Sequence, residues 1–180
     1  MFVNGDFLEF AQVSPDVYQL GSSKYWCSEA ESKQKLEAML SGHADIFAAM
    51  GKFQESGNRV TIAAGNHDVD FWWPEVQKRF AQAAGHVSYE LGEKWYPRYN
   101  GQLLIGHGHL FDPANTFKHW RYPIIADPYG TPRLEMCPGT LFMVKFVNWL
   151  EVKYPFSDNI KPVTALGHIL WKEDRTGLAA

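Results

Sequence analysis

Three short stretches of the sequence contain side chains that could bind a metal ion. They are "GD" at residues 5–6, "GNHD" at residues 65–68 and "GHGH" at residues 106–109, and each follows an apolar run. Carboxylate and amide oxygens together with imidazole nitrogens form a mixed ligand set that suits Mn²⁺, Fe or Zn²⁺, whereas structural zinc sites usually contain thiolates. The residue types therefore predict a divalent-metal site if the fold brings the three stretches together.

The apolar run before each stretch predicts a short buried strand. The runs occupy residues 1–4, 59–64 and 102–106, and a glycine follows or ends each of them. In α/β proteins, ligands bind where the loops leave the carboxyl ends of the strands. We therefore expect the polar stretches to meet at one edge of a sheet.

Helices are predicted between these strands. Apolar residues at helical spacing predict two helical pieces between residues 28 and 55, with a break near Gly42. A further helix should begin near Pro74 and end at Gly85. The Asn-Gly pair at residues 100–101 is a strong hairpin signal. Alternating strands and helices predict the α/β class.

Composition excludes several other classes of protein. A chain of 180 residues with 46% apolar content can form one compact core, which predicts a single domain over residues 1–180. A net charge of −3 supplies no extended basic surface for nucleic acid. Two cysteines are too few for a disulfide framework, and neither a signal peptide nor an apolar run of eighteen residues is present. We therefore expect a cytoplasmic protein.

Taken in order, the three stretches resemble the motifs of a known family. "NGDFLEF", "AAGNHD" and "LIGHGHLFDPAN" are similar to the second, third and fourth motifs of the calcineurin-like metallophosphoesterases. The nearer likeness is to the bacterial branch that includes the UDP-2,3-diacylglucosamine pyrophosphohydrolases, where an acidic residue also stands three positions after the second-motif aspartate. The likeness runs from about Met1 to Pro162. It implies a layered β-sandwich flanked by helices.

The resemblance also implies a role for each motif residue. Asp6 would be the carboxylate that bridges two metal ions, while Asn66 and His107 would bind the second ion. His67 would act on the substrate, by stabilising developing charge or protonating the leaving oxygen, and Asp68 would orient its ring. In the complete family site two ions, here most simply Mn²⁺ with Fe or Zn²⁺ as alternatives, hold the phosphoryl group and promote attack by water.

The likeness is incomplete at both ends of the chain. No Asp-x-His first motif precedes Asp6, and the final Gly-His-x-His motif is missing if residues 106–109 are the fourth motif. The resemblance therefore implies a truncated fold that lacks the first strand and the C-terminal strands. The second metal would keep Asp6, Asn66 and His107, whereas the first would keep only Asp6. Such a site could hold one ion instead of two and have impaired activity.

Two motif residues have alternative interpretations. His109 could instead belong to the family's last motif and bind a metal, although "LFDPAN" after it favours the fourth-motif assignment. Glu9 is interpreted as an acid that supports the site rather than as a ligand. By itself, "GNHD" at residues 65–68 would be no more than a turn, since Asn and Asp favour turns.

The main functional hypothesis is metal-dependent hydrolysis of a phosphoester or pyrophosphate bond in a small-molecule or nucleotide-type substrate. The alternative is a non-catalytic remnant of the family that binds a metal or another protein. A serine hydrolase is disfavoured because the sequence has no Gly-x-Ser-x-Gly motif.

The C-terminal segment, residues 139–180, is predicted to be mostly helical. Its stretch "TLFMVKFVNWLEV", residues 140–152, is apolar on more than one face but too short to span a bilayer. It could be a helix buried on two faces, or one that covers a substrate cleft and makes peripheral contact with lipid or a membrane. A homodimer that shares sheet edges is a further hypothesis.

Overall fold

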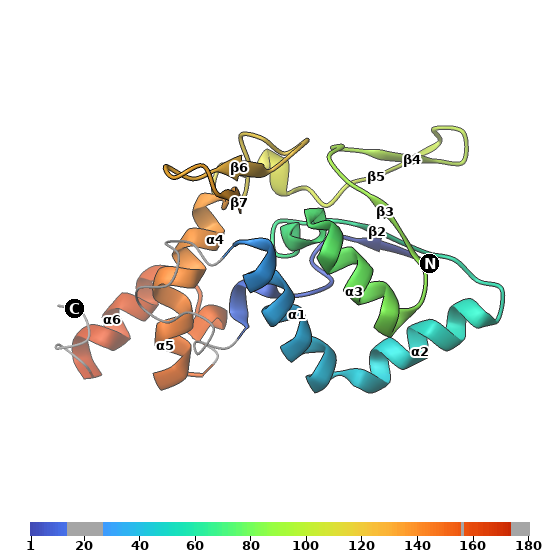
Figure 1. Cartoon of the computed structure of the whole chain (residues 1–180). Coiled ribbons are helices and arrows are strands. Elements are labelled where there is room, and N and C mark those ends of the chain that lie inside the picture. The colour runs from blue at the N-terminus through green and yellow to red at the C-terminus, as the bar shows by residue number, and fades with distance from the viewer. Residues whose placement is uncertain (14–26, 156, 174–180) are drawn as a thin grey trace. The chain divides into compact units, whose positions relative to one another are not determined.

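The computed structural model of the chain describes residues 1–13, 27–155 and 157–173 (Figure 1). The chain forms two compact units, Met1–Leu141 and Phe142–Ala180. In the part of the chain that the structure describes, none of the helices combines the length and apolarity that crossing a membrane requires.

A three-stranded parallel sheet lies at the centre of the first unit. Its order is β1-β2-β3, formed by Phe2–Asn4, Val60–Ala63 and Val87–Glu90. Asn4 pairs with Ala63, the last residue of β2. The strands predicted at residues 1–4 and 59–64 are confirmed, and their parallel pairing places their carboxyl ends at the same edge.

Three helices connect these strands. α1, Glu29–Gly42, and α2, Ala44–Glu55, lie between β1 and β2, and α3, Pro74–Ala84, lies between β2 and β3. The predicted break near Gly42 is confirmed, because His43 separates the first two helices. Gly85 ends α3 with a φ of +83°, a conformation that glycine adopts without strain.

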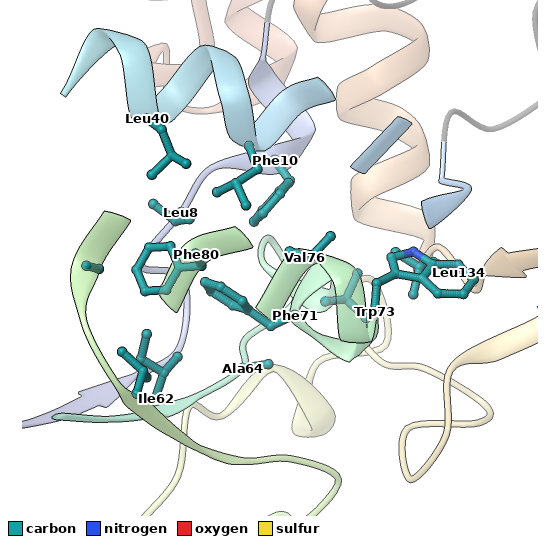
Figure 2. Close-up of a cluster of buried hydrophobic side chains, with 14 of the residues drawn as sticks. Leu8, Phe10, Leu40, Ile62, Ala64, Phe71, Trp73, Val76, Phe80 and Leu134 are labelled. Carbon is teal, nitrogen blue, oxygen red and sulfur yellow. The ribbon is translucent and has the colours of Figure 1, made fainter. Parts of the chain in front are cut away.

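The apolar face of α3 forms the middle of the core. Val76, Phe80 and Ala84 recur at intervals of four residues, and each is 0% exposed. Figure 2 shows Phe80 beside Phe71, and the two rings meet edge to face with centroids 5.3 Å apart. Side chains of α1, α2 and β2 complete this cluster, including Leu36, Leu40, Phe47, Met50, Val60 and Ile62.

A buried polar group links α1 to the 3₁₀ helix Val69–Trp72, which precedes α3. We call it the helix cluster, and it consists of Ser32, Lys35 and Asp70, none more than 4% exposed. Ser32 Oγ donates a hydrogen bond of 2.5 Å to Asp70 Oδ1, and Lys35 Nζ lies 4.0 Å from the same oxygen. Burial raises the pKa of the Asp70 carboxyl, although Lys35 and Ser32 oppose this shift.

A hairpin follows the parallel sheet. β4, Tyr96–Arg98, pairs in antiparallel fashion with β5, Leu103–Ile105. The predicted Asn-Gly turn is confirmed, since Asn100 and Gly101 both have positive φ. The prediction that β5 is buried is wrong, because Leu103 and Leu104 are 45% and 55% exposed. An apolar run does not reveal whether a strand joins a covered sheet or a two-stranded hairpin.

Further hairpin strands and helices complete the part of the chain that the structure describes. A second hairpin pairs β6, Ile124–Ala126, with β7, Pro132–Leu134. Short 3₁₀ helices occupy Phe10–Gln12, Val69–Trp72, His109–Phe111 and Ser157–Asn159. The helical C-terminal segment contains α4, Pro138–Phe142, a π-helical turn, Met143–Val147, α5, Asn148–Lys153, and α6, Val163–Glu173.

The helix predicted at residues 140–152 is therefore present, but it changes to π-helical geometry in its middle. In the second unit Leu150 is fully buried against Phe146, Tyr154 and Ile160. Val152 on the same helix is 70% exposed.

The mixed α/β class is confirmed. Among the described residues the strands form one three-stranded and two two-stranded sheets. Sheets of this size do not by themselves establish the layered sandwich of the calcineurin-like fold.

Candidate functional site

Three of the predicted ligands converge where strands end. Asp6 follows β1, Asn66 follows β2 and His107 follows β5. His107 Nε2 lies 3.0 Å from Asp6 Oδ2 and 3.2 Å from Asn66 Oδ1. We call these three residues the strand-end cluster. Residues far apart in the sequence thus direct two oxygens at one imidazole nitrogen.

Glycines allow this close approach. Gly5 has a φ of +77°, and a Cβ at this position would lie 2.5 Å from the His107 ring. A Cβ on Gly65 would lie 2.7 Å from the backbone nitrogen of Asp6. Asp6 itself has a φ of +50°, in the left-handed region that Asp and Asn tolerate better than most residues. The backbone at both strand ends is therefore shaped to bring the side chains together.

The strand end before His107 is joined directly to β1. His107 Nδ1 lies 2.9 Å from the Asn4 carbonyl oxygen, and Asn4 Nδ2 donates a 3.2 Å hydrogen bond to the Gly106 carbonyl. Because a carbonyl only accepts, Nδ1 must carry a proton, and Nε2 then faces two oxygen acceptors. The point between them requires positive charge, supplied either by a proton on Nε2 or by a bound cation.

The electrostatics of Asp6 and His107 agree with this arrangement. The hydrogen bond to Asp6 raises the pKa of His107 despite its partial burial. Burial by itself would raise the pKa of Asp6, but hydrogen bonds from His107 and from the backbone of His67 outweigh it and the pKa is lowered. The side chains of His107 and Asp6 are 21% and 32% exposed, so a solute can reach the cluster.

His67 lies beside the strand-end cluster with a different carboxylate from the one expected. Its backbone nitrogen donates a 3.0 Å hydrogen bond to Asp6 Oδ1, and its Nδ1 contacts Glu9 Oε2. The hydrogen bond with Glu9 raises the pKa of the His67 ring. Glu9, interpreted from the sequence as a supporting acid, is thus the residue that holds this imidazole.

The expected partnership between Asp68 and the His67 ring is replaced by backbone contacts. Asp68 Oδ2 accepts a 2.8 Å hydrogen bond from the Phe7 nitrogen, and its Oδ1 accepts one of 2.5 Å from the Gly65 nitrogen. Burial raises the pKa of this carboxyl to about 6, although these donors act in the opposite direction. Asp68 therefore joins the loops that follow β1 and β2.

His109 has a separate environment from His107. It is 7% exposed, and its ring centroid lies 4.3 Å from that of Trp120 and 5.2 Å from that of His107. Neither of its ring nitrogens has a hydrogen-bond partner among the described residues. Burial lowers its pKa to about 4, so the ring is neutral at physiological pH.

Two residues without a role in the sequence hypothesis, Asn115 and Asp112, extend the hydrogen bonding from Asn66. Asn66 Nδ2 donates a 3.3 Å hydrogen bond to Asn115 Oδ1, and Asn115 Nδ2 donates one of 2.6 Å to Asp112 Oδ2. Both residues lie in the "LFDPAN" stretch that contributed to the family resemblance. Their Asp-x-x-Asn spacing is a common turn pattern, so the sequence alone offered no reason to assign them to a site.

A groove of about 710 Å³ is lined by residues 92–95, 110 and 116–122. The indole of Trp120, which packs on His109, forms part of its wall. Aromatic and cationic side chains line the rest, among them Trp95, Tyr122, Lys94, Lys118 and Arg121.

The chemistry of the strand-end cluster suits a divalent cation, but the cluster contains only two residues of the commonest ligand types. In the part of the chain that is described, no group of three or more His, Cys, Asp or Glu residues is arranged to hold a metal ion. The third ligand atom here is the amide oxygen of Asn66. Comparison of the chain with protein-family models, with curated proteins and with solved structures gives no match.

Proposed function

We propose that the protein is a metal-dependent hydrolase of phosphoester or pyrophosphate bonds with a calcineurin-like arrangement of motifs. The observation that carries this proposal is the convergence of Asp6 Oδ2 and Asn66 Oδ1 on His107 Nε2. Each of the three atoms belongs to a ligand position of the family motifs. The other ring nitrogen of His107, Nδ1, donates a hydrogen bond to a backbone carbonyl, as metal-binding histidines commonly do.

The spacing of these atoms fits a shared ion. Two ligand atoms at right angles around an octahedral cation, each about 2.1 Å from it, lie about 3.0 Å apart. The contacts from His107 to Asp6 and Asn66 measure 3.0 and 3.2 Å. Oxygen and imidazole ligands favour Mn²⁺, with Zn²⁺ and Fe as alternatives. These three residues would hold one ion.

A cation bound there would polarise a phosphoryl oxygen and make water a better nucleophile. His67 would supply the proton for the leaving oxygen, because the hydrogen bond with Glu9 raises its pKa and so favours the protonated ring. Asp68 would hold the loops of Asp6 and His67 in register through its two backbone hydrogen bonds. Lys94, Lys118 and Arg121 outnumber the acid Glu93 in the lining of the groove, which would favour an anionic substrate.

Substitution of Asp6 by asparagine tests the proposal. Asparagine tolerates the positive φ of this position and can still accept the hydrogen bond from His67, so the fold should persist. We expect Mn²⁺ affinity, measured by calorimetry, to fall on the order of 100-fold, with hydrolysis of p-nitrophenyl phosphate and of a pyrophosphate diester lost in parallel. Equal Mn²⁺ affinity in D6N and wild type would contradict the proposal.

Substitution of His67 by alanine separates catalysis from metal binding. Because the His67 ring contacts Glu9 and lies outside the three-ligand set, H67A should keep its Mn²⁺ affinity. The turnover number should fall about 100-fold, since a positioned general acid contributes on that order. Loss of the ion in H67A would show instead that the ring is a ligand.

A non-catalytic metal-binding protein is the second candidate. The strand-end cluster offers ligands for one ion, and one of these ligands is an amide, whereas the family's complete site holds two ions. This difference favours the second candidate. Mn²⁺ binding that depends on Asp6, without turnover of any substrate in a phosphatase panel, would establish this alternative.

A further inference from the structure

We infer that Asp112 and Asn115 are positioning residues that turn the carbonyl oxygen of Asn66, and not its amide nitrogen, toward the point shared with Asp6 and His107. The inference rests on the proposed function, because it assigns the source of one ligand atom of that site. Hydrogen bonds connect the side chains of Asp112, Asn115 and Asn66, from the loop after β5 to the loop after β2. We call these three hydrogen-bonded side chains the relay.

Asp112 sets the direction of the relay. Its Oδ1 accepts a 2.9 Å hydrogen bond from the Ala114 nitrogen, and its Oδ2 accepts one of 2.6 Å from Asn115 Nδ2. An ionised carboxylate can only accept hydrogen bonds. Asn115 must therefore present its NH₂ group to Asp112, which leaves its oxygen to face the other way.

The orientation of the Asn115 amide determines the orientation of the Asn66 amide. The Asn115 oxygen, Oδ1, accepts the 3.3 Å hydrogen bond from Asn66 Nδ2. Asn66 Oδ1 is then the atom left to face His107 Nε2 at 3.2 Å. The two ends of an amide are nearly equal in size, so sterics alone do not choose between them. The fixed acceptor at Asp112 makes the choice.

Packing keeps the relay in place. Asn66 is 4% exposed, and Thr140 Oγ1 donates a 3.4 Å hydrogen bond to its backbone oxygen. The Gly139 nitrogen donates a 2.6 Å hydrogen bond to the Ala114 oxygen, and a Cβ at Gly139 would lie 2.5 Å from Asn115 Oδ1. The amide of Asn115 therefore lies directly against a backbone that has no room for a side chain.

Isosteric substitution of Asp112 reverses the relay. In D112N, the new side-chain oxygen accepts the hydrogen bond from the Ala114 nitrogen, so the new NH₂ group faces Asn115. The Asn115 amide must then rotate to accept from this NH₂ group, and it presents its own NH₂ group to Asn66. Asn66 then directs NH₂ at His107. In the double variant D112N/N115D, the new carboxylate accepts from both neighbours and restores the native direction.

The orientation is measured first in metal-free full-length protein by NMR. We expect a nuclear Overhauser effect between the side-chain amide protons of Asn66 and Hε1 of His107 to appear in D112N. It should be absent in the wild type and absent again in D112N/N115D. The same pattern in all three proteins would overturn the inference.

The consequence for metal is measured by Mn²⁺ calorimetry on the same proteins and on D112A. We expect D112N to bind Mn²⁺ 10- to 100-fold more weakly than the wild type. D112A removes the same charge but leaves both amides free to turn, so it should lose less than tenfold. The double variant should recover to within a few-fold of the wild type. D112A binding as weakly as D112N would contradict the relay, because loss of charge or of packing would then explain both.

Failure of the two proposals gives different results. Absence of Mn²⁺ binding in the wild type, together with the expected amide pattern, would overturn the proposed function and leave the relay established. Mn²⁺ binding that depends on Asp6, with no amide reversal in D112N, would overturn the relay alone.

Discussion

The helix cluster and the strand-end cluster are two polar groups built on opposite principles. In the helix cluster, Asp70 accepts a hydrogen bond from the Ser32 hydroxyl and lies near the ammonium group of Lys35, and all three residues are buried. In the strand-end cluster, oxygens of Asp6 and Asn66 face one imidazole nitrogen, and solvent reaches the group.

The helix cluster therefore stabilises the fold, whereas the strand-end cluster is arranged to bind a ligand. Hydrogen-bond donors and acceptors in the helix cluster complement each other, so this cluster does not require a ligand. The strand-end cluster requires a positive charge that its residues provide only when His107 is doubly protonated. We therefore expect changes in the helix cluster to affect stability, and changes in the strand-end cluster to affect metal binding.

The largest effect on stability should come from Asp70→Ala. Removal of the carboxylate takes away the charge that balances Lys35 inside the core, and breaking a buried pair in this way costs about 3–5 kcal/mol. Urea denaturation should show this loss while Mn²⁺ affinity stays within twofold of the wild type. Glu37→Ala, which breaks an ion pair to Arg79 that is about half exposed at Glu37, is the control and should cost less than about 1 kcal/mol. A change in metal affinity in D70A would show that the helix cluster also contributes to metal binding.

A smaller effect should follow the titration of Asp68. Its pKa is raised by burial to about 6, so the native state binds this proton more tightly than the unfolded state does. This contribution to stability is complete below the pKa of Asp68 in the unfolded state, near 4, and is lost as pH rises through about 6. The pKa difference corresponds to at most about 3 kcal/mol of folding free energy.

Asp68→Asn removes this titration. Urea denaturation of D68N and wild type between pH 4 and pH 7 should show that the wild type loses stability relative to the variant as pH rises. D68N should be less stable at pH 4, because its NH₂ group faces a backbone N–H of Phe7 or Gly65. A stability difference independent of pH would show that Asp68 stays ionised in the native protein.

The smallest effect is expected for His109→Leu. The buried ring has no hydrogen-bond partner for either nitrogen within the described structure, so leucine should be neutral or stabilising by up to about 1 kcal/mol. Mn²⁺ affinity should not change. Thermal denaturation and calorimetry check both, and a large loss of affinity would place His109 among the metal ligands.

Much of the main sheet and its helices follows from local patterns. The strands before Asp6 and Asn66, and the buried stripe of α3 at Val76, Phe80 and Ala84, are visible as apolar runs and spacing. The exposure of β5 is not, because an apolar run carries no information about what covers the strand.

The candidate site was predictable to the extent that its residues stand in motifs. Asp6, Asn66 and His107 could be named because each follows an apolar run and each stands at a ligand position of the family motifs that the sequence resembles. The partners of Asp68 could not, because backbone N–H groups are present at every residue but proline. Asp112 and Asn115 act through the direction of an amide, which depends on contacts between loops distant in sequence.

The most direct test of the central claim is anomalous diffraction from crystals of the full-length protein saturated with Mn²⁺. We expect an anomalous peak about 2.1–2.3 Å from Asp6 Oδ2, Asn66 Oδ1 and His107 Nε2, with the Asn66 amide still hydrogen-bonded to Asn115. A peak elsewhere, or none at this position under saturating Mn²⁺, would contradict the claim that the strand-end cluster is a metal site.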